Sequence, residues 1–233
     1  VVPWALETGI PPQGARCFYA PLAIIRWAKN DAGEISGEII HDCRKTFRPL
    51  TDLESCCTFH VGDGIHSFGD FDSIEEALQN LPDAGGKICV LPGEHKANIT
   101  IINRKNVCIC GCGERSIVIP NQDRFVEPIV RIASSQNICL EKLNLAHPGG
   151  IAVILYDRDP ELLPSSDIRI SNNRILALLF GIYIEVIDTI RGKNNIYIGH
   201  NKMAMVDKED GNVAIFCLAD EVLVERNKIV VLQ

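Results

Sequence analysis

The chain has 233 residues, of which 46% are hydrophobic and 23% charged, and its formal net charge is -7. This composition predicts a folded protein with a large core. The negative charge argues against nucleic acid as the main partner, because phosphate binding needs a basic face. The sequence has no run of about eighteen apolar residues, which a membrane-spanning helix would need, so we expect no membrane partner.

The first 60 residues predict an irregular, β-rich segment. They hold five of the twelve prolines and four of the ten cysteines. The stretch "AIIRWAKNDAGEISGEIIHDC" reads as two strands around a turn at residues 30–33. We expect this segment, residues 1–60, to pack on the remainder of the chain, residues 61–233.

The stretch "FDSIEEALQNLPDAGG" predicts a short helix over residues 73–81. Ser73 and Glu76 have the spacing of a capping box. An apolar stripe at helical spacing indicates one buried face, formed by Ile74, Ala77, Leu78 and Leu81. The Gly85–Gly86 pair ends the segment.

After this helix the apolar period becomes two, in a pattern that recurs. One strand type reads "NVCI" at 106, "NICL" at 137, "DIRI" at 167, "NIYI" at 195 and "EVLV" at 221, with steps of 31, 30, 28 and 26 residues. A second type includes "GIAV" at 150 and "GIYI" at 181, and a third includes "RILA" at 174, "KMAM" at 202 and "KIVV" at 228. Three short strands in each period of about thirty residues indicate a parallel β-helix, in which coils stack about 4.8 Å apart.

A β-sandwich or jelly roll also gives many short strands, and it remains the alternative. It does not demand one residue type at the same bend of every repeat. Asparagine stands six residues after the recurrent start in three successive repeats, at Asn173, Asn201 and Asn227. Such residues can hydrogen-bond from coil to coil as a ladder, which favours the β-helix.

The segment from Ser73 to His95, "SIEEALQNLPDAGGKICVLPGEH", together with the coils after it, resembles the pectate-lyase-like superfamily. The resemblance implies an all-β fold: a right-handed parallel β-helix of about five coils over residues 61–233, capped by the helix at 73–81. The superfamily includes lyases, hydrolases, epimerases, phage tail spikes and non-catalytic modules, so the resemblance says little about activity. It also implies a part of a larger bacterial or phage-like protein, secreted, at a surface or in a particle.

An enzyme of this kind would carry its catalytic carboxylates on an outer face. Asp157 and Asp188 each lie six residues after an apolar strand residue, Ile151 and Ile182, and we expect them to stack on adjacent coils. Arg191 would then act as base or neutralise a uronate. The neighbouring Arg158 and Asp159 are candidate carbohydrate contacts, and the lyase reading allows a calcium ion. The alternative reading makes both aspartates turn residues at strand ends.

The cysteines predict a docking face rather than a metal site. Cys89, Cys108 and Cys139 each stand between the two inward residues of a strand, so we expect a row of sulfur on one outer face. The first segment should cover this row, with thiols or disulfides contributed by Cys17, Cys43, Cys56 and Cys57. Zinc is the less favoured reading because no CxxC motif occurs. We predict no metal or cofactor, apart from calcium in the lyase case.

These observations favour a non-catalytic structural or interaction module of a larger protein, with weak glycan binding on an outer face. The alternative is a polysaccharide lyase or glycoside hydrolase that uses Asp157, Asp188 and Arg191 on an acidic polysaccharide. The final stretch "KIVVLQ" lies in mid-coil, and an uncovered coil end presents sheet edges. We expect other domains of the parent chain or a symmetry mate to pair with that end.

Overall fold

The computed structural model describes residues 23–29, 32–33, 35–42, 57–157, 163–186, 194–206 and 211–232. The chain divides into two compact units, Val1–Leu53 and Glu54–Gln233, and each is described by itself. This division precedes the predicted boundary at residue 60, because the strand Phe59–Val61 already pairs with a strand of the second unit. None of the described helices is long and apolar enough to cross a membrane.

The first unit contains a hairpin. Its strands β1 (Ala23–Lys29) and β2 (Ile35–Asp42) pair antiparallel, and Gly33 adopts a φ of 85° in the turn. This confirms the two strands and the turn predicted there. The packing of this segment on the coils stays a prediction, and Cys17, Cys43 and Cys56 lie outside the described residues.

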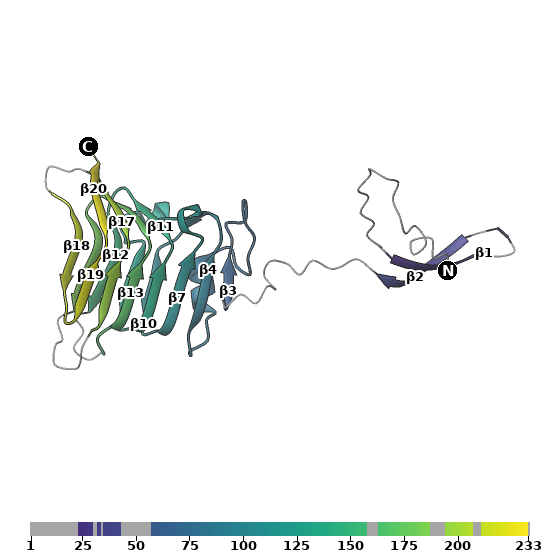
Figure 1. Ribbon diagram of the computed structural model, residues 1–233, viewed down its shortest axis with the longest axis horizontal. Helices are drawn as coiled ribbons and strands as arrows, with labels where there is room; N and C mark the ends of the chain where they lie inside the picture. The colour runs from purple at the N-terminus through teal and green to yellow at the C-terminus, as the bar shows by residue number, and fades with distance from the viewer. Residues whose placement is uncertain are drawn as a thin grey trace, which may run out of the picture. The chain divides into compact units, whose positions relative to one another are not determined.

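The second unit is a parallel β-helix with three sheets (Figure 1). The seven-stranded sheet comprises β3 (Phe59–Val61), β4 (Gly86–Val90), β7 (Lys105–Gly111), β10 (Gln136–Glu141), β13 (Ser166–Ser171), β16 (Ile196–Gly199) and β19 (Val222–Glu225). The six-stranded sheet comprises β5 (Gly93–Lys96), β8 (Ser116–Ile119), β11 (Asn144–His147), β14 (Arg174–Ala177), β17 (Lys202–Val206) and β20 (Lys228–Leu232). The five-stranded sheet comprises β6 (Ile99–Ile102), β9 (Val130–Ala133), β12 (Ile151–Asp157), β15 (Phe180–Val186) and β18 (Val213–Leu218).

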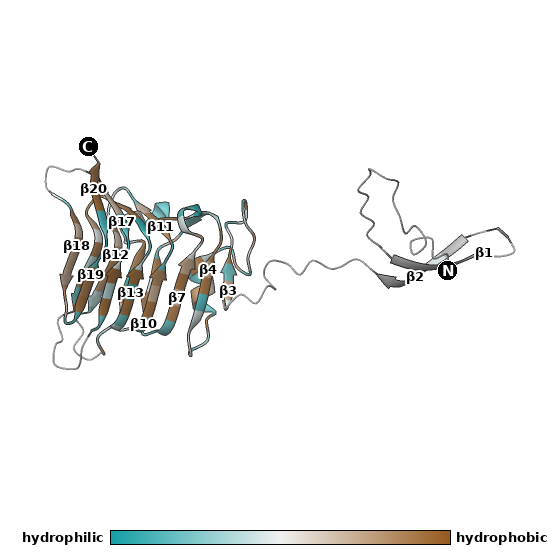
Figure 2. Ribbon diagram, in the orientation of Figure 1, coloured by the Kyte–Doolittle hydropathy of each residue, from teal (hydrophilic) through white to brown (hydrophobic). Residues whose placement is uncertain are grey.

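Each of these strands pairs in parallel with its counterpart one coil away, which confirms the predicted fold of about five coils with three strands each. Alternate strand residues point inward, so apolar stretches run along the strands in Figure 2. The inward pair of β10, Ile138 and Leu140, stacks on Val107 and Ile109 of the preceding coil, as predicted. These side chains are 1% exposed or less, and together with their equivalents they fill the coil.

Helix α2 (Ile74–Gln79) is the predicted cap. The Ser73 side chain accepts a hydrogen bond from the Glu76 amide at 3.3 Å, which satisfies one of the free amides of the first turn. The whole predicted apolar stripe is at most 4% exposed, namely Ile74, Ala77, Leu78 and Leu81. Two short 3-10 helices, η2 (Gly113–Arg115) and η3 (Gln122–Arg124), lie in turns between strands.

An Asn, Asp or Glu recurs at the start of five strands of the seven-stranded sheet, β7, β10, β13, β16 and β19, and the backbone conformation there explains it. All five of these residues have a left-handed φ between 48° and 57°: Asn106, Asn137, Asp167, Asn195 and Glu221. Asparagine and aspartate tolerate this conformation better than most residues with a side chain. Two of the bends are also linked by side chains, since Asn195 donates to Asp167 Oδ1 at 2.7 Å.

The predicted asparagine ladder is present at a second bend. The Oδ1 atom of Asn201 accepts from the backbone amide of Asn173 at 3.0 Å and from its side-chain amide at 3.1 Å. Asn227 accepts the same two bonds from Asn201, both at 3.0 Å. Each side-chain amide also donates to a strand carbonyl, as Asn201 does to Ile170 at 2.9 Å. The ladder therefore joins this bend to the equivalent bend of the next coil by hydrogen bonds.

The register predicted for the five-stranded sheet is wrong by two residues. Ile182 pairs with Val153 and not with Ile151. Both β12 and β15 have seven residues, and the third and fifth residues of each face the core, so the "GI" motif does not mark equivalent positions. As a result Asp157 lies opposite Val186, one coil away, and not opposite Asp188.

The predicted sulfur row is correct for Cys108 and Cys139, which pair in register, but wrong for Cys89, which pairs with Cys110. Gly86 takes the position opposite Val107. A Cβ at Gly86 would lie 2.5 Å from the Thr58 hydroxyl oxygen and 2.9 Å from a Leu81 methyl carbon, so a larger residue would force these side chains to move. Cys89 instead forms a disulfide with Cys57, which agrees with the expected disulfide from the preceding segment.

The coil formed by β18, β19 and β20 is the last of the described coils, and its inward residues are only partly covered. Val224, Ile229 and Val231 are 47%, 49% and 56% exposed, whereas their counterparts one coil earlier are at most 1% exposed. The three strands each stand at the end of a sheet. This end therefore combines apolar side chains with unpaired strand edges.

Candidate functional site

Asp157, the one member of the predicted catalytic set within the described residues, holds the backbone of two bends. Its Oδ1 atom accepts from the Ser134 amide and its Oδ2 atom from the Ser165 amide, each at 2.7 Å. The residue is 7% exposed, and Ser165 is fully buried. This arrangement fits the alternative interpretation, in which Asp157 is a turn residue at the end of a strand.

The rest of that set lies outside the described residues: Asp188, Arg191, Arg158 and Asp159. The catalytic and carbohydrate-binding roles assigned to these residues stay predictions.

A row of cations crosses the outer face of the six-stranded sheet. Arg174, Lys202 and Lys228 are the first residues of β14, β17 and β20, and they pair directly with one another in register. All three are exposed, and Asn144 continues the row on β11. In-register strands lie about 4.8 Å apart, so the charges recur at that spacing along the coil axis.

An apolar row runs beside the cations. Leu176, Ala204 and Val230 pair in register two residues further along the same strands. The two rows line a groove of about 450 Å³. Arg174 is partly neutralised by Glu114, whose carboxylate lies 2.7 Å from its guanidinium. This surface, formed by the three cations and the three apolar residues, is called the basic groove below.

The basic groove was not predicted, although the sequence carries a signal for it. The third strand type begins with Arg or Lys in three successive repeats, in "RILA", "KMAM" and "KIVV". An outward charge at the same strand position of adjacent coils must stack. Inward apolar residues define the repeat, whereas the groove depends on the outward residues of the same strands.

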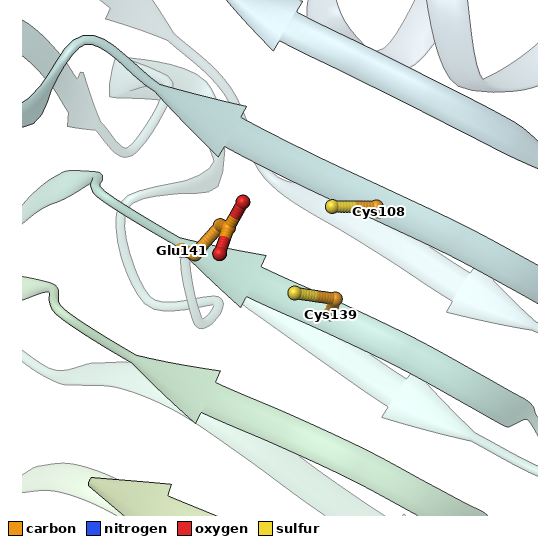
Figure 3. A group of neighbouring side chains, drawn as sticks. All are labelled: Cys108, Cys139 and Glu141. Carbon is orange, nitrogen blue, oxygen red and sulfur yellow. The ribbon is translucent and has the colours of Figure 1, made fainter. Parts of the chain in front are cut away.

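The outer face of the seven-stranded sheet carries a cluster of sulfur and carboxylate groups (Figure 3). Cys108 of β7 and Cys139 of β10 pair in register, and Glu141 stands two residues beyond Cys139 on the same face. One ligand atom from each of the three lies within 4.8 Å of the other two. Lys87 of β4 approaches the Glu141 carboxylate to 3.7 Å.

The two thiols in this cluster are not equivalent. The pKa of Cys139 is lowered because the Cys108 thiol donates a hydrogen bond to its sulfur. The same hydrogen bond, together with burial, raises the pKa of Cys108. Burial, reinforced by Glu141, raises the pKa of the nearby Cys110 to about 11. Cys139 is thus the thiol of this face that ionises first.

A second groove, of about 450 Å³, lies on the same sheet over β10, β13 and β16. The guanidinium carbon of Arg169 stands 4.9 Å from the centre of the Tyr197 ring, and the Tyr197 hydroxyl donates to Glu225 at 3.1 Å. Cation–π contact of this kind orders an arginine at a surface. Asp167 and Asn195 line the groove at the bend side.

No protein-family model matches the chain, and no curated protein matches it in sequence. Among solved structures, one that is similar is a pectin methylesterase mutant in complex with a hexasaccharide, with 11% identity and a TM-score of 0.37; the match covers 67% of this chain and 58% of that chain. Another is the deglycosylated pectin methylesterase from Aspergillus niger, with 13% identity and a TM-score of 0.36, covering 76% of this chain and 86% of that chain. This chain thus spans less than two thirds of the first structure's length.

Proposed function

We propose that the β-helix is a non-catalytic interaction module that binds an acidic polysaccharide in the basic groove. The observation that carries the proposal is the in-register row of Arg174, Lys202 and Lys228. The chain as a whole has a net charge of -7, so three adjacent cations are a local departure from its general charge.

The groove suits a linear polymer better than a compact anion. Its cations recur once per coil along the axis, so a chain that lies parallel to the axis can present one carboxylate to each cation. The apolar row of Leu176, Ala204 and Val230 lies alongside, where the C–H faces of sugar rings can pack. A small anion would need the cations to converge on one point, and they stand on three separate strands.

The residues that line the groove supply binding groups and no acid–base pair. Among the described residues, those that line the groove are one asparagine, three cations and apolar side chains, and the nearby Glu114 carboxylate is engaged in the ion pair with Arg174. Hydrolysis of a glycosidic bond by the usual route needs two carboxyl groups at the bond. Asp157, the described member of the predicted catalytic set, lies on a different sheet with both carboxylate oxygens engaged by backbone amides.

Lys202 offers the cleanest test, because it is the central cation of the row. We expect Lys202→Ala to weaken binding of polygalacturonate about three- to fivefold, and Lys202→Glu at least about tenfold, as exposed charge pairs contribute up to about 1 kcal/mol each. Binding should also weaken as salt concentration rises. Isothermal titration calorimetry at two ionic strengths measures both effects.

Lys96→Ala is the matched control, since Lys96 is an exposed residue of the same sheet outside the groove. It should bind like the parent chain. Neutral dextran should not bind, and a DNA duplex serves as a second polyanion. Equal affinity for DNA and polygalacturonate, or unchanged binding by Lys202→Glu, would contradict the proposal.

We also propose that the partly covered end at β18, β19 and β20 is an assembly face for a second copy of the chain. A second copy offers three strand edges and the same apolar residues, so both sides gain hydrogen bonds and buried area. We expect concentration-dependent dimers in sedimentation velocity. Val231→Lys should raise the dimer dissociation constant at least about tenfold, because it would bury a charge.

Val126→Lys is the control for that experiment, since Val126 is already 94% exposed and lies in a turn. It should dimerise like the parent chain. A monomer at every concentration would refute the proposal, and would leave a further segment of a longer protein as the occupant of this end.

A further inference from the structure

The cluster of Cys108, Cys139 and Glu141 has the composition of a metal site. Two sulfur atoms and one carboxylate oxygen gather within 4.8 Å on a single sheet face. Figure 3 shows the two cysteine side chains extended in the same direction from adjacent strands, with Glu141 next to them. Their proximity follows from the register, because outward residues of paired strands must lie side by side.

We propose that Cys108, Cys139 and Glu141 bind one zinc ion on the outer face of β7 and β10. Tetrahedral zinc holds thiolate sulfur at about 2.3 Å and carboxylate oxygen at about 2.1 Å, so two of its donors stand about 3.5 Å to 3.8 Å apart. The three ligand atoms lie within 4.8 Å of one another, so each pair needs to approach by no more than about 1 Å to reach zinc-binding distances. Solvent takes the fourth position.

The donor set selects zinc over calcium or magnesium. Thiolates are soft ligands that suit zinc and copper(I), whereas calcium takes six to eight oxygen ligands. Two thiolates and one carboxylate around a divalent ion leave one net negative charge. The Lys87 ammonium group, 3.7 Å from the Glu141 carboxylate, lies where it can balance that charge.

The partial burial of the cluster also favours a bound ion. All three residues are intermediate in exposure, so the ion would be sheltered from bulk water while solvent can still reach it. This inference is independent of the polysaccharide proposal, because the basic groove lies on another sheet.

The test uses the full chain, reduced and freed of metal, and titrated with zinc or with cobalt(II) as a spectroscopic probe. Cobalt(II) bound to thiolate gives a sulfur-to-metal charge-transfer band whose intensity rises with the number of thiolates. We expect the parent chain to show this band. Cys108→Ser and Cys139→Ser should each lose at least about half of the band intensity that arises from cobalt(II) bound at the cluster. Each should weaken zinc binding by about 100-fold or more.

Glu141→Gln separates ligation from folding, because it leaves both thiols in place. It should keep the band and weaken zinc binding about 10- to 100-fold. Cys112→Ser and Cys217→Ser are matched controls, since neither cysteine belongs to the cluster, and both should behave like the parent. Cysteines outside the described residues are the same in every variant, so a difference in metal binding between variants is due to the cluster.

Two results would overturn the proposal. One is a Cys108→Ser or Cys139→Ser variant, folded by circular dichroism, that binds as much zinc with the same affinity as the parent. The other is a Cys108–Cys139 disulfide, mapped by mass spectrometry, in protein that was kept in zinc throughout purification. The second result would identify the pair as a redox couple instead.

Discussion

Replacing Asn201 by alanine is expected to lower the free energy of unfolding by about 4 kcal/mol. Four hydrogen bonds disappear: two that its Oδ1 atom accepts from Asn173, and two that its amide donates to Ile170 and Asn227. Asn173 is 1% exposed, so water cannot replace the lost partner of its backbone amide. Each buried group left without a partner costs about 1 to 3 kcal/mol. Urea titration followed by far-ultraviolet circular dichroism measures the loss.

Asn227→Ala provides a graded control for the ladder. Asn227 accepts the equivalent bonds from Asn201, which is itself 1% exposed, but the Asn227 side chain is only partly buried, so water can enter the space that it vacates and replace it as acceptor. We expect its loss to be less than half of that of Asn201→Ala. Equal losses at the two positions would show that burial does not set the contribution of the ladder.

Asp157→Ala is expected to lower the free energy of unfolding by about 3 kcal/mol. The change removes two hydrogen bonds from backbone amides to a carboxylate, and leaves the fully buried Ser165 without its acceptor. Asp157→Asn keeps one acceptor oxygen and should lose about half as much. Thermal and urea melts of the three proteins give this order.

The same variants test the enzyme alternative. If Asp157 is a catalytic residue, the parent chain should degrade a polyuronate in the presence or absence of calcium, and Asp157→Asn should abolish that activity. If a variant has the same melting temperature as the parent but lacks this activity, Asp157 is a catalytic residue. Loss of stability without any polyuronate degradation by the parent supports the structural role.

The fold was predictable because two physical signals repeat in every coil. Alternating apolar residues set the inward face, and Asn, Asp or Glu at the left-handed bends marks where strands of the seven-stranded sheet begin. Register depends on how many residues each bend contains, which the strand pattern does not state. The prediction therefore failed for Asp157 and for Cys89, where bends of different length shift the pairing by two residues.

The candidate sites were harder to predict for the same reason. The zinc cluster depends on Cys108 facing Cys139, which was predicted, and on Glu141 lying on the same face, which was not considered. The basic groove depends on an outward Arg or Lys at the start of three strands, and these residues can be read directly from the sequence. Both sites are thus encoded in the outward residues of successive repeats, as the core is encoded in the inward ones.

The Cys57–Cys89 disulfide makes the two ends of the described β-helix unequal. It cross-links Cys89 of β4 to the segment that leads into β3. Since each coil contacts only its neighbours, local opening is expected to begin at a terminal coil. The disulfide restrains one of these coils, so we expect fraying to start at the partly covered coil of β18, β19 and β20, where backbone amides should exchange with solvent fastest.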